Sequence, residues 1–186
     1  LVEETISIRL EDNAWDIVNK LSELSGDLLV TTLQKLPQQQ IRPRPQDDAK
    51  ATYASLIKKE DYTLDWSKSA KALHDKVRGF YPNCVSLFRE TPVKIIKTLP
   101  LGAPYWEMLD DQNAELRSLF AAASLDAQAA PGTIVAILKN YGPVVSTGSG
   151  ELLLQEVKPA GKKARSGWDF ANGRRLNVGE VLGNLA

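Results

Sequence analysis

The chain has 186 residues, of which 43% are hydrophobic and 25% charged, and its 23 Lys and Arg balance its 23 Asp and Glu. This composition is typical of a globular protein and excludes a disordered or collagen-like chain. No apolar run approaches the roughly 20 residues that a membrane-spanning helix needs, and a single cysteine, Cys84, excludes an internal disulfide and a cysteine-based metal cluster. We therefore expect a protein of the cytoplasm or of an organelle matrix, with no membrane segment and no metal site.

Residues 1–36 are predicted to hold one strand followed by two helices. Residues 5–10 alternate polar and apolar side chains, which predicts a half-buried strand, and Asp12 and Asn13 are suited to cap the helix that follows. Gly26 interrupts the apolar stripe of this helix, so a second helix is expected after it. So short a stretch cannot bury a core of its own, and the first residue is not Met. We interpret this part as the end of a domain in a longer protein.

Residues 37–57 are predicted to form an interdomain linker. They show no apolar periodicity, and their prolines favour an extended backbone. Arg42 and Arg44 lie between these prolines. They either contact an anionic partner or are simply solvated.

Residues 58–186 are predicted to begin with an amphipathic helix. Ser67 is its expected N-cap. Its apolar face is expected to consist of Ala70, Leu73, Val77 and Phe80. The single histidine, His74, lies at the flank of this face, and no carboxylate or nucleophile is placed beside it by sequence. We interpret it as a helix-surface or boundary residue without a catalytic role.

Five short β-strands are predicted after this helix. They are residues 85–88, 93–97, 132–138, 142–147 and 151–157. Short strands at this spacing favour a small OB-type barrel over a parallel sheet, so the expected fold class is α+β.

An insert at residues 100–130 separates the two groups of strands. It is expected to be mobile and to contain a helix at residues 113–123. Tyr105 and Trp106 either offer a stacking platform for a base or dock the insert onto the barrel.

Positive charge is concentrated at residues 157–179, which hold six Lys or Arg against one acid, Asp169. The six cations are Lys158, Lys162, Lys163, Arg165, Arg174 and Arg175. The first four are expected in a turn after the last strand, and the last two after a short helical segment at residues 166–172. Clustered cations on turns bind phosphates by displacing condensed counterions. The alternative is a solvated charged surface.

No set of residues in the chain assembles an active site. There is no Gly-rich phosphate loop, no metal-ligand spacing and no nucleophile beside a base. The paired acids at residues 47–48 and 110–111 lie in loop-like sequence, where solvated charge is expected. Cys84 has no cationic neighbour within two residues that would activate it.

Several segments together resemble the methionyl-tRNA formyltransferase family. They are A-T-Y-A at residues 51–54 with the K-K-E and L-D-W-S that follow, P-G-T-I at 131–134, P-A-G-K-K at 159–163, W-D-F at 168–170, N-G-R-R-L at 172–176, Gly179 and L-G at 182–183. Their order and spacing over most of the chain make the resemblance specific. Three departures affect local surface detail: residues 81–84 replace N-P-W-P, Ser149 replaces the Asp of G-D-G, and the insert is longer than usual.

The resemblance implies a formyl transfer from 10-formyltetrahydrofolate to methionyl-initiator tRNA, performed by a monomeric enzyme. The family's catalytic Asn, His and Asp lie upstream of the position that Leu1 matches, so the resemblance places no catalytic residue and no bound cofactor in this chain. Residues 1–36 resemble the end of the catalytic domain, residues 37–57 the linker, and residues 58–186 the OB-like domain that helps to hold initiator tRNA. The tRNA-binding residues it implies are Lys158, Lys162, Lys163, Arg165, Arg174 and Arg175, with Arg42 and Arg44 of the linker.

Two alternatives remain at the level of sequence. One is a related enzyme on the same catalytic domain, namely a formyltetrahydrofolate hydrolase or dehydrogenase, or a sugar-amine formyltransferase. The basic stretch argues against these, because a small substrate needs no such phosphate-binding surface. The other is an OB-type nucleic-acid-binding module without catalysis.

Overall fold

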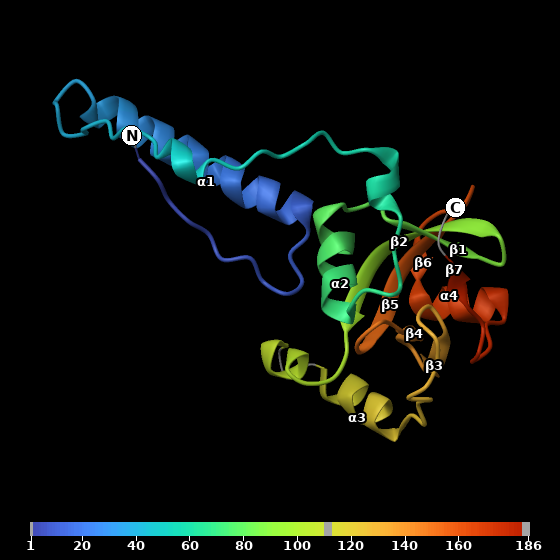
Figure 1. Ribbon diagram of the computed structural model, residues 1–186. Helices are drawn as coiled ribbons and strands as arrows, with labels where there is room; N and C mark the ends of the chain where they lie inside the picture. The colour runs from blue at the N-terminus through green and yellow to red at the C-terminus, as the bar shows by residue number, and fades with distance from the viewer. Residues whose placement is uncertain (1, 110–112, 184–186) are drawn as a thin grey trace. The chain divides into compact units, whose positions relative to one another are not determined.

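The computed structural model describes residues 2–109 and 113–183 (Figure 1). The chain divides into two compact units, Leu1–Lys58 and Lys59–Ala186. The domain boundaries predicted above, after residues 36 and 57, stay a prediction. The paired acids Asp110 and Asp111 lie outside the described residues.

The first unit is built around one long helix, α1 (Ala14–Lys35). Asn13 caps it as predicted: its Oδ1 accepts hydrogen bonds from the backbone N–H of Trp15 and Asp16, and the Asp16 carboxylate accepts from the N–H of Asn13. The prediction of two helices was wrong, because α1 continues through Gly26. A glycine costs a helix only about 1 kcal/mol relative to Ala, which the neighbouring turns outweigh.

The strand predicted at residues 5–10 was also wrong, since these residues form no ladder with any described segment. Alternation of side chains predicts a strand only where another strand can accept its hydrogen bonds. The stretch after α1 is largely irregular, as predicted, with one turn of 3₁₀ helix, η1 (Asp48–Lys50).

The second unit is a curled antiparallel sheet with helices packed on it. Its strands are β1 (Val85–Phe88), β2 (Thr91–Pro100), β3 (Ile134–Leu138), β4 (Gly142–Ser146), β5 (Glu151–Pro159), β6 (Arg165–Ser166) and β7 (Leu182–Gly183). The strand order is β3-β4-β5-β2-β1-β7, and β6 pairs with β5. The α+β class and the five predicted strands are confirmed. The two-residue strands β6 and β7 were missed, because so short a run shows no periodicity.

Residues 179–183 join the two ends of this sheet and close it into an OB-like barrel. β7 pairs with β1, while Val181 bridges Thr133 just before β3. Three backbone hydrogen bonds reinforce the second contact. The N–H of Ile134 donates to the carbonyl of Glu180 (2.7 Å), and the N–H of Gly179 donates to the carbonyl of Ile134 (2.8 Å). The N–H of Leu182 donates to the carbonyl of Gly132 (2.8 Å). Gly132 has φ +91°, and a Cβ there would lie 2.5 Å from the Leu182 carbonyl oxygen. The closure therefore requires glycine in the P-G-T-I turn.

The core lies between the sheet and α2 (Ala70–Gly79), which packs on β2. The predicted face is confirmed, since Ala70, Leu73 and Val77 are each no more than 2% exposed. The N-cap is Ser69, whose hydroxyl accepts from the Ala72 N–H. Ser67 was therefore the wrong cap, because its hydroxyl and its N–H both bind the Asp65 carboxylate instead.

Two polar side chains of the core are held by partners on the sheet. His74 is only 3% exposed, and its Nδ1 lies 3.0 Å from the Thr98 hydroxyl on β2, so the prediction of a surface or boundary residue was wrong. Trp66, 2% exposed, donates from Nε1 to the Ser86 hydroxyl, which donates in turn to the carbonyl of Gly183. This relay connects the L-D-W segment to the strand that closes the barrel.

The insert carries a 3₁₀ turn, η3 (Tyr105–Met108), and the predicted helix, α3 (Ala114–Ala122). The Trp106 ring packs edge-on against Phe120 of α3 with 5.8 Å between centroids. Arg117 lies over the same ring and donates to the Trp106 carbonyl. Both partners of Trp106 lie in the insert itself, so the two alternatives, a stacking platform and docking of the insert onto the barrel, stay predictions.

The remaining helices of this unit are η2 (Lys59–Tyr62) and α4 (Gly167–Arg174). α4 packs on β4 and β5, and it begins so close to the sheet that a Cβ on Gly167 would lie 1.8 Å from the Leu154 carbonyl oxygen. Only a glycine at the first position of α4 allows this approach.

We predict that Gly167→Ala lowers the free energy of unfolding by roughly 2–3 kcal/mol, because α4 must move away from β5. The measurement is urea denaturation followed by circular dichroism. Gly79→Ala is the matched control, since a Cβ there meets nothing within 4 Å. If both variants unfolded at the same urea concentration as wild type, the close approach of α4 to β5 would not be a constraint.

Candidate nucleic-acid interface

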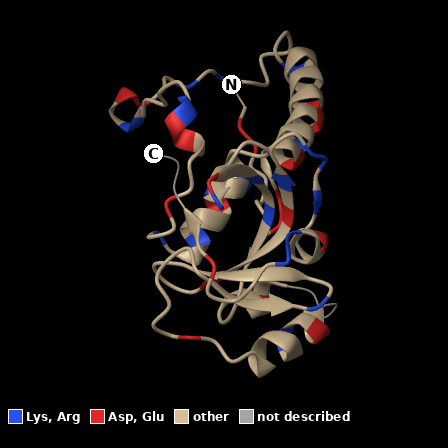
Figure 2. Ribbon diagram, turned by 90° about the vertical axis from the view of Figure 1, so that its right-hand side faces the viewer, with Lys and Arg blue, Asp and Glu red and all other residues tan. Residues whose placement is uncertain are grey.

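The structure places the six predicted cations of residues 157–179 on two strands, on the turn between them and at the end of α4. Lys158 lies in β5 and Arg165 in β6, so the prediction that both lie in a turn was wrong. Lys162 and Lys163 do occupy the exposed turn between these strands, and Arg174 and Arg175 are exposed at the end of α4. Figure 2 shows Lys and Arg, in blue, on strands as well as in loops.

Strand register divides these cations between the two faces of the sheet. Arg165 pairs with Val157, which is fully buried, and Lys158 follows Val157 in β5. Because successive side chains of a strand point to opposite faces, Arg165 shares the core-side face with Val157, whereas Lys158 lies on the outer face. The predicted cluster is therefore two groups of cations rather than one.

The first group gathers at the C-terminal end of α4. A Cβ on Gly173 would lie 3.3 Å from Nη1 of Arg165, which places that half-buried guanidinium beside the last turn. Arg89, from the β1–β2 turn, donates to the carbonyls of Arg174 (3.2 Å) and Arg175 (3.5 Å). Cations at this end complement the helix dipole, so local structure already favours positive charge here.

Arg89 is a member of this group that sequence reasoning missed. It occupies a two-residue turn with φ 48° and donates from Nε and Nη2 to Glu180 Oε1 at 2.8 and 2.6 Å. A lone Arg in a hairpin turn carries no signal in sequence, because its partners lie in a distant segment. By holding the last carbonyls of α4, Arg89 fixes the backbone from which Arg174 and Arg175 project.

The acids near these cations are already engaged. The Asp169 carboxylate accepts from the Ser166 hydroxyl that caps α4. Desolvation raises the pKa of Glu180, but the Asn177 N–H and the Arg89 guanidinium outweigh it, so the net pKa lies below its ordinary value of 4.5. Over residues 2–109 and 113–183, no carboxylate lies within 4.0 Å of a basic nitrogen of the six cations. Their charge therefore remains available to an anion.

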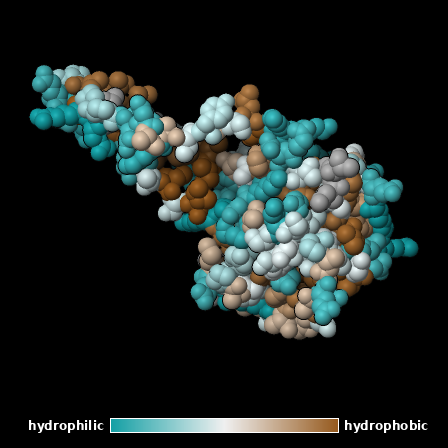
Figure 3. Space-filling model, in the orientation of Figure 1, coloured by the Kyte–Doolittle hydropathy of each residue, from teal (hydrophilic) through white to brown (hydrophobic). Residues whose placement is uncertain are grey.

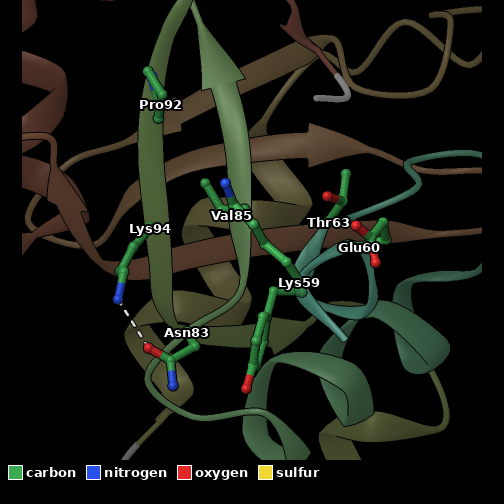
Figure 4. A pocket seen from close by; sticks show the side chains of 8 residues that line it. Lys59, Glu60, Thr63, Asn83, Val85, Pro92 and Lys94 are labelled. Atoms are coloured by element: carbon green, nitrogen blue, oxygen red, sulfur yellow. Dashed lines mark hydrogen bonds between the residues drawn. The ribbon is translucent and has the colours of Figure 1, made fainter. Parts of the chain in front are cut away.

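On the outer face, a groove of about 670 Å³ adjoins the β1–β2 hairpin (Figure 4). It is lined by Lys59, Glu60, Tyr62, Thr63, Asn83, Val85, Pro92 and Lys94. In Figure 4, Lys94 on β2 reaches the side chain of Asn83, and the bond from Nζ to Oδ1 measures 2.8 Å. Sequence reasoning missed these residues, because the bridge between Thr63 and Val85 that brings η2 to the β1–β2 hairpin cannot be read from local pattern.

Arg42 and Arg44, the other two predicted cations, lie exposed in the first unit. Arg44 lines a shallow hollow with Glu3 and Asp47. Their part in tRNA binding stays a prediction.

The groups that could react chemically are buried. His74 lies on the side of α2 that packs against β2. Desolvation raises the pKa of the Cys84 thiol to about 11, so the thiol is not a nucleophile at neutral pH. Among the described residues, no three His, Cys, Asp or Glu side chains converge as metal ligands. No helix in the described ranges has the length and apolar character to cross a membrane.

Comparison with known proteins connects these features to a family. Residues 56–175 match the family described as "Formyl transferase, C-terminal domain". A methionyl-tRNA formyltransferase of Nostoc sp. is 52% identical over 99% of this chain, and one of Cyanothece sp. is 46% identical over 98%. The chain spans about half of these relatives, 54% and 55% of their lengths. HypX from Aquifex aeolicus in complex with tetrahydrofolic acid, at 15% identity, shares the fold with a TM-score of 0.61 over 95% of this chain and 28% of HypX.

We predict that Glu180→Gln lowers Tm at pH 7 and that its difference from wild type disappears on acidification. The folded-state pKa of Glu180 lies below 4.5, so its stabilising effect is complete above that pH and is lost as the pH falls through the folded-state value. Thermal melts between pH 7 and 3 measure this. Glu107→Gln, at an exposed position on η3, serves as control. A difference from wild type that stays the same size at every pH would contradict the role of the Arg89–Glu180 pair.

Proposed function

The chain belongs to the formyl transferase family, as its C-terminal domain, and from that premise we propose that the full-length protein is a methionyl-tRNA formyltransferase. It transfers a formyl group from 10-formyltetrahydrofolate to the amino group of methionyl-initiator tRNA, in the compartment where translation begins. The observation that carries this proposal is 46–52% identity, over nearly the whole chain, to relatives with that name. The folate in the HypX complex supports the class of formyl donor.

Within that enzyme, the second unit has the role of docking tRNA. Lys162 and Lys163 on the β5–β6 turn, and Arg174 and Arg175 at the end of α4, are exposed and have no acid within ion-pair distance among the described residues. Such cations bind backbone phosphates by releasing counterions, which positions a nucleic acid without reading its sequence. Selection of the initiator tRNA then depends on other parts of the enzyme.

The first unit contributes a surface for the catalytic domain upstream. Trp15 and Val18 on the first turns of α1, and Leu29 and Leu33 on the last, are 58–64% exposed. Hydrophobic surface along α1 is visible in Figure 3. Apolar side chains on one helix stripe are normally covered, and relatives have roughly as much further sequence as this chain contains. We assign the catalytic residues and the folate site to that upstream portion, in a protein that acts as a monomer.

The related folate enzymes with small substrates are weaker candidates. A small sugar amine or water makes no use of cations that lie on a turn and at a helix end. A binding module without catalysis is also disfavoured, because the named relatives extend well beyond the segment they share with this chain.

The first test of this proposal is a formylation assay with charged initiator tRNA and 10-formyltetrahydrofolate. We expect the full-length protein to formylate the methionyl group, and residues 1–186 alone to show no activity, because the reactive groups of this chain are buried. An inactive full-length protein that is folded and binds folate would overturn the proposed activity. Activity of residues 1–186 alone would overturn the assignment of catalysis upstream.

The second test neutralises the exposed cations, with Lys162, Lys163, Arg174 and Arg175 all changed to Ala in the full-length protein. We expect weaker tRNA binding and a less steep plot of log K against log[KCl], with the slope reduced by about 1 for each phosphate that is no longer neutralised. Fluorescence anisotropy at several salt concentrations measures both quantities. Lys139→Ala, in the β3–β4 turn, is the control. An unchanged slope would mean that these four side chains are only solvated.

A further inference from the structure

Two lysines face each other across the β2–β5 ladder. Lys94 and Lys158 are direct register partners on the outer face of the sheet, and each is followed in its strand by a buried residue, Ile95 and Pro159. Like charges in directly opposed positions of an antiparallel pair destabilise the sheet, since their Cβ atoms lie only about 5 Å apart. The fold therefore keeps a repulsive pair at a position where a neutral side chain would be more stable.

Nothing acidic in the described part of the chain neutralises this pair. No carboxylate lies within 4.0 Å of either ammonium, and the neighbouring acid on the same strand, Glu156, is opposite Lys97 in the register. The Lys94 ammonium instead donates to Oδ1 of Asn83 at 2.8 Å. This neutral acceptor fixes the position of the charge without cancelling it and leaves the other N–H groups of Lys94 for a ligand.

The pair also lies where two hollows of the surface meet. The groove of about 670 Å³ shares Val85, Pro92 and Lys94 with a second hollow of about 220 Å³, which Lys158 and Pro159 line as well. Val85 and Pro92 are the apolar walls that both hollows share beside the ammonium groups, whereas the far part of the larger groove is lined by Lys59, Glu60, Tyr62 and Thr63. Apolar walls lower the local dielectric, so the attraction of the two charges for an anion is stronger here than on an open surface.

We propose that Lys94 and Lys158 together bind a backbone phosphate of the tRNA, with the adjoining groove receiving the sugar-phosphate chain on either side. This inference rests on the proposed function and extends it, because it adds a phosphate subsite on the outer face of the sheet to the cations at the end of α4. A lysine ammonium on a flexible stem binds phosphate as a point charge, and two stems from opposed positions can converge on one phosphate group. A bound phosphate would also remove the repulsion between them.

The test uses Lys94→Gln, Lys158→Gln, the double variant and Asn83→Asp in the full-length protein, with Lys139→Gln as control. Binding of initiator tRNA is measured over a KCl series, and Tm is measured without tRNA. Each single Lys variant is expected to weaken binding roughly five- to tenfold at low salt. The double variant, in which the phosphate is no longer neutralised, is expected to reduce the salt slope by about 1, and each single variant by less. Asn83→Asp keeps the acceptor for Lys94 but adds a negative charge, so it is expected to weaken binding with no loss of Tm.

Stability provides the readout that separates binding from structure. Lys158→Gln is expected to raise Tm, or leave it unchanged, at low ionic strength, because it relieves repulsion, and the gain should vanish in high salt. Lower Tm with unchanged tRNA affinity would overturn the proposal and make the pair structural. Wild-type affinity and slope in the double variant would overturn it while leaving the proposed function intact. A wild-type protein that binds no tRNA would overturn both.

Discussion

The whole second unit depends on a few backbone hydrogen bonds that close its barrel. Residues 179–183 pair with β1 on one side and with residues 132–134 on the other, so this short segment completes a sheet that would otherwise remain open. The closure explains why Gly132 is required, and it buries Trp66 and Ser86 in a relay that ends on the same segment. It also brings Glu180 to Arg89 and so fixes the end of α4.

Closure also determines how charge is distributed over the protein. The net charge is zero, but acids near the α4 end are engaged by caps and by Arg89, whereas nearby cations remain exposed. The outer face adds Lys94 and Lys158, whose repulsion the sheet tolerates. The proposed role of docking tRNA would use such a surface, because it is positive and spread over rigid elements.

Sequence patterns predicted what depends on local periodicity and failed where distant segments meet. The spacing of the short apolar runs, such as residues 85–88 and 151–157, and the apolar face of α2 were sufficient to predict strands and helix. The strand at residues 5–10 failed because alternation does not supply a ladder partner. The basic stretch was identified from charge alone, but its division between two faces follows from the register of Arg165 with Val157. Sequence reasoning missed Lys94 for the same reason, because its register partner, Lys158, lies in β5, which does not follow β2 directly in the sequence.

The small size of the closing strand has a consequence for the nascent or partly unfolded protein. Until residues 179–183 are in place, the Leu87–Phe88 end of β1 and the Ile134 end of β3 both have unpaired N–H and C=O groups. β3 consists of Ile134–Leu138, an uncharged β-branched segment of the kind that pairs readily with other chains. Residues 179–182 thus cover the start of an aggregation-prone edge, and conditions that detach them leave it open to pairing with other chains.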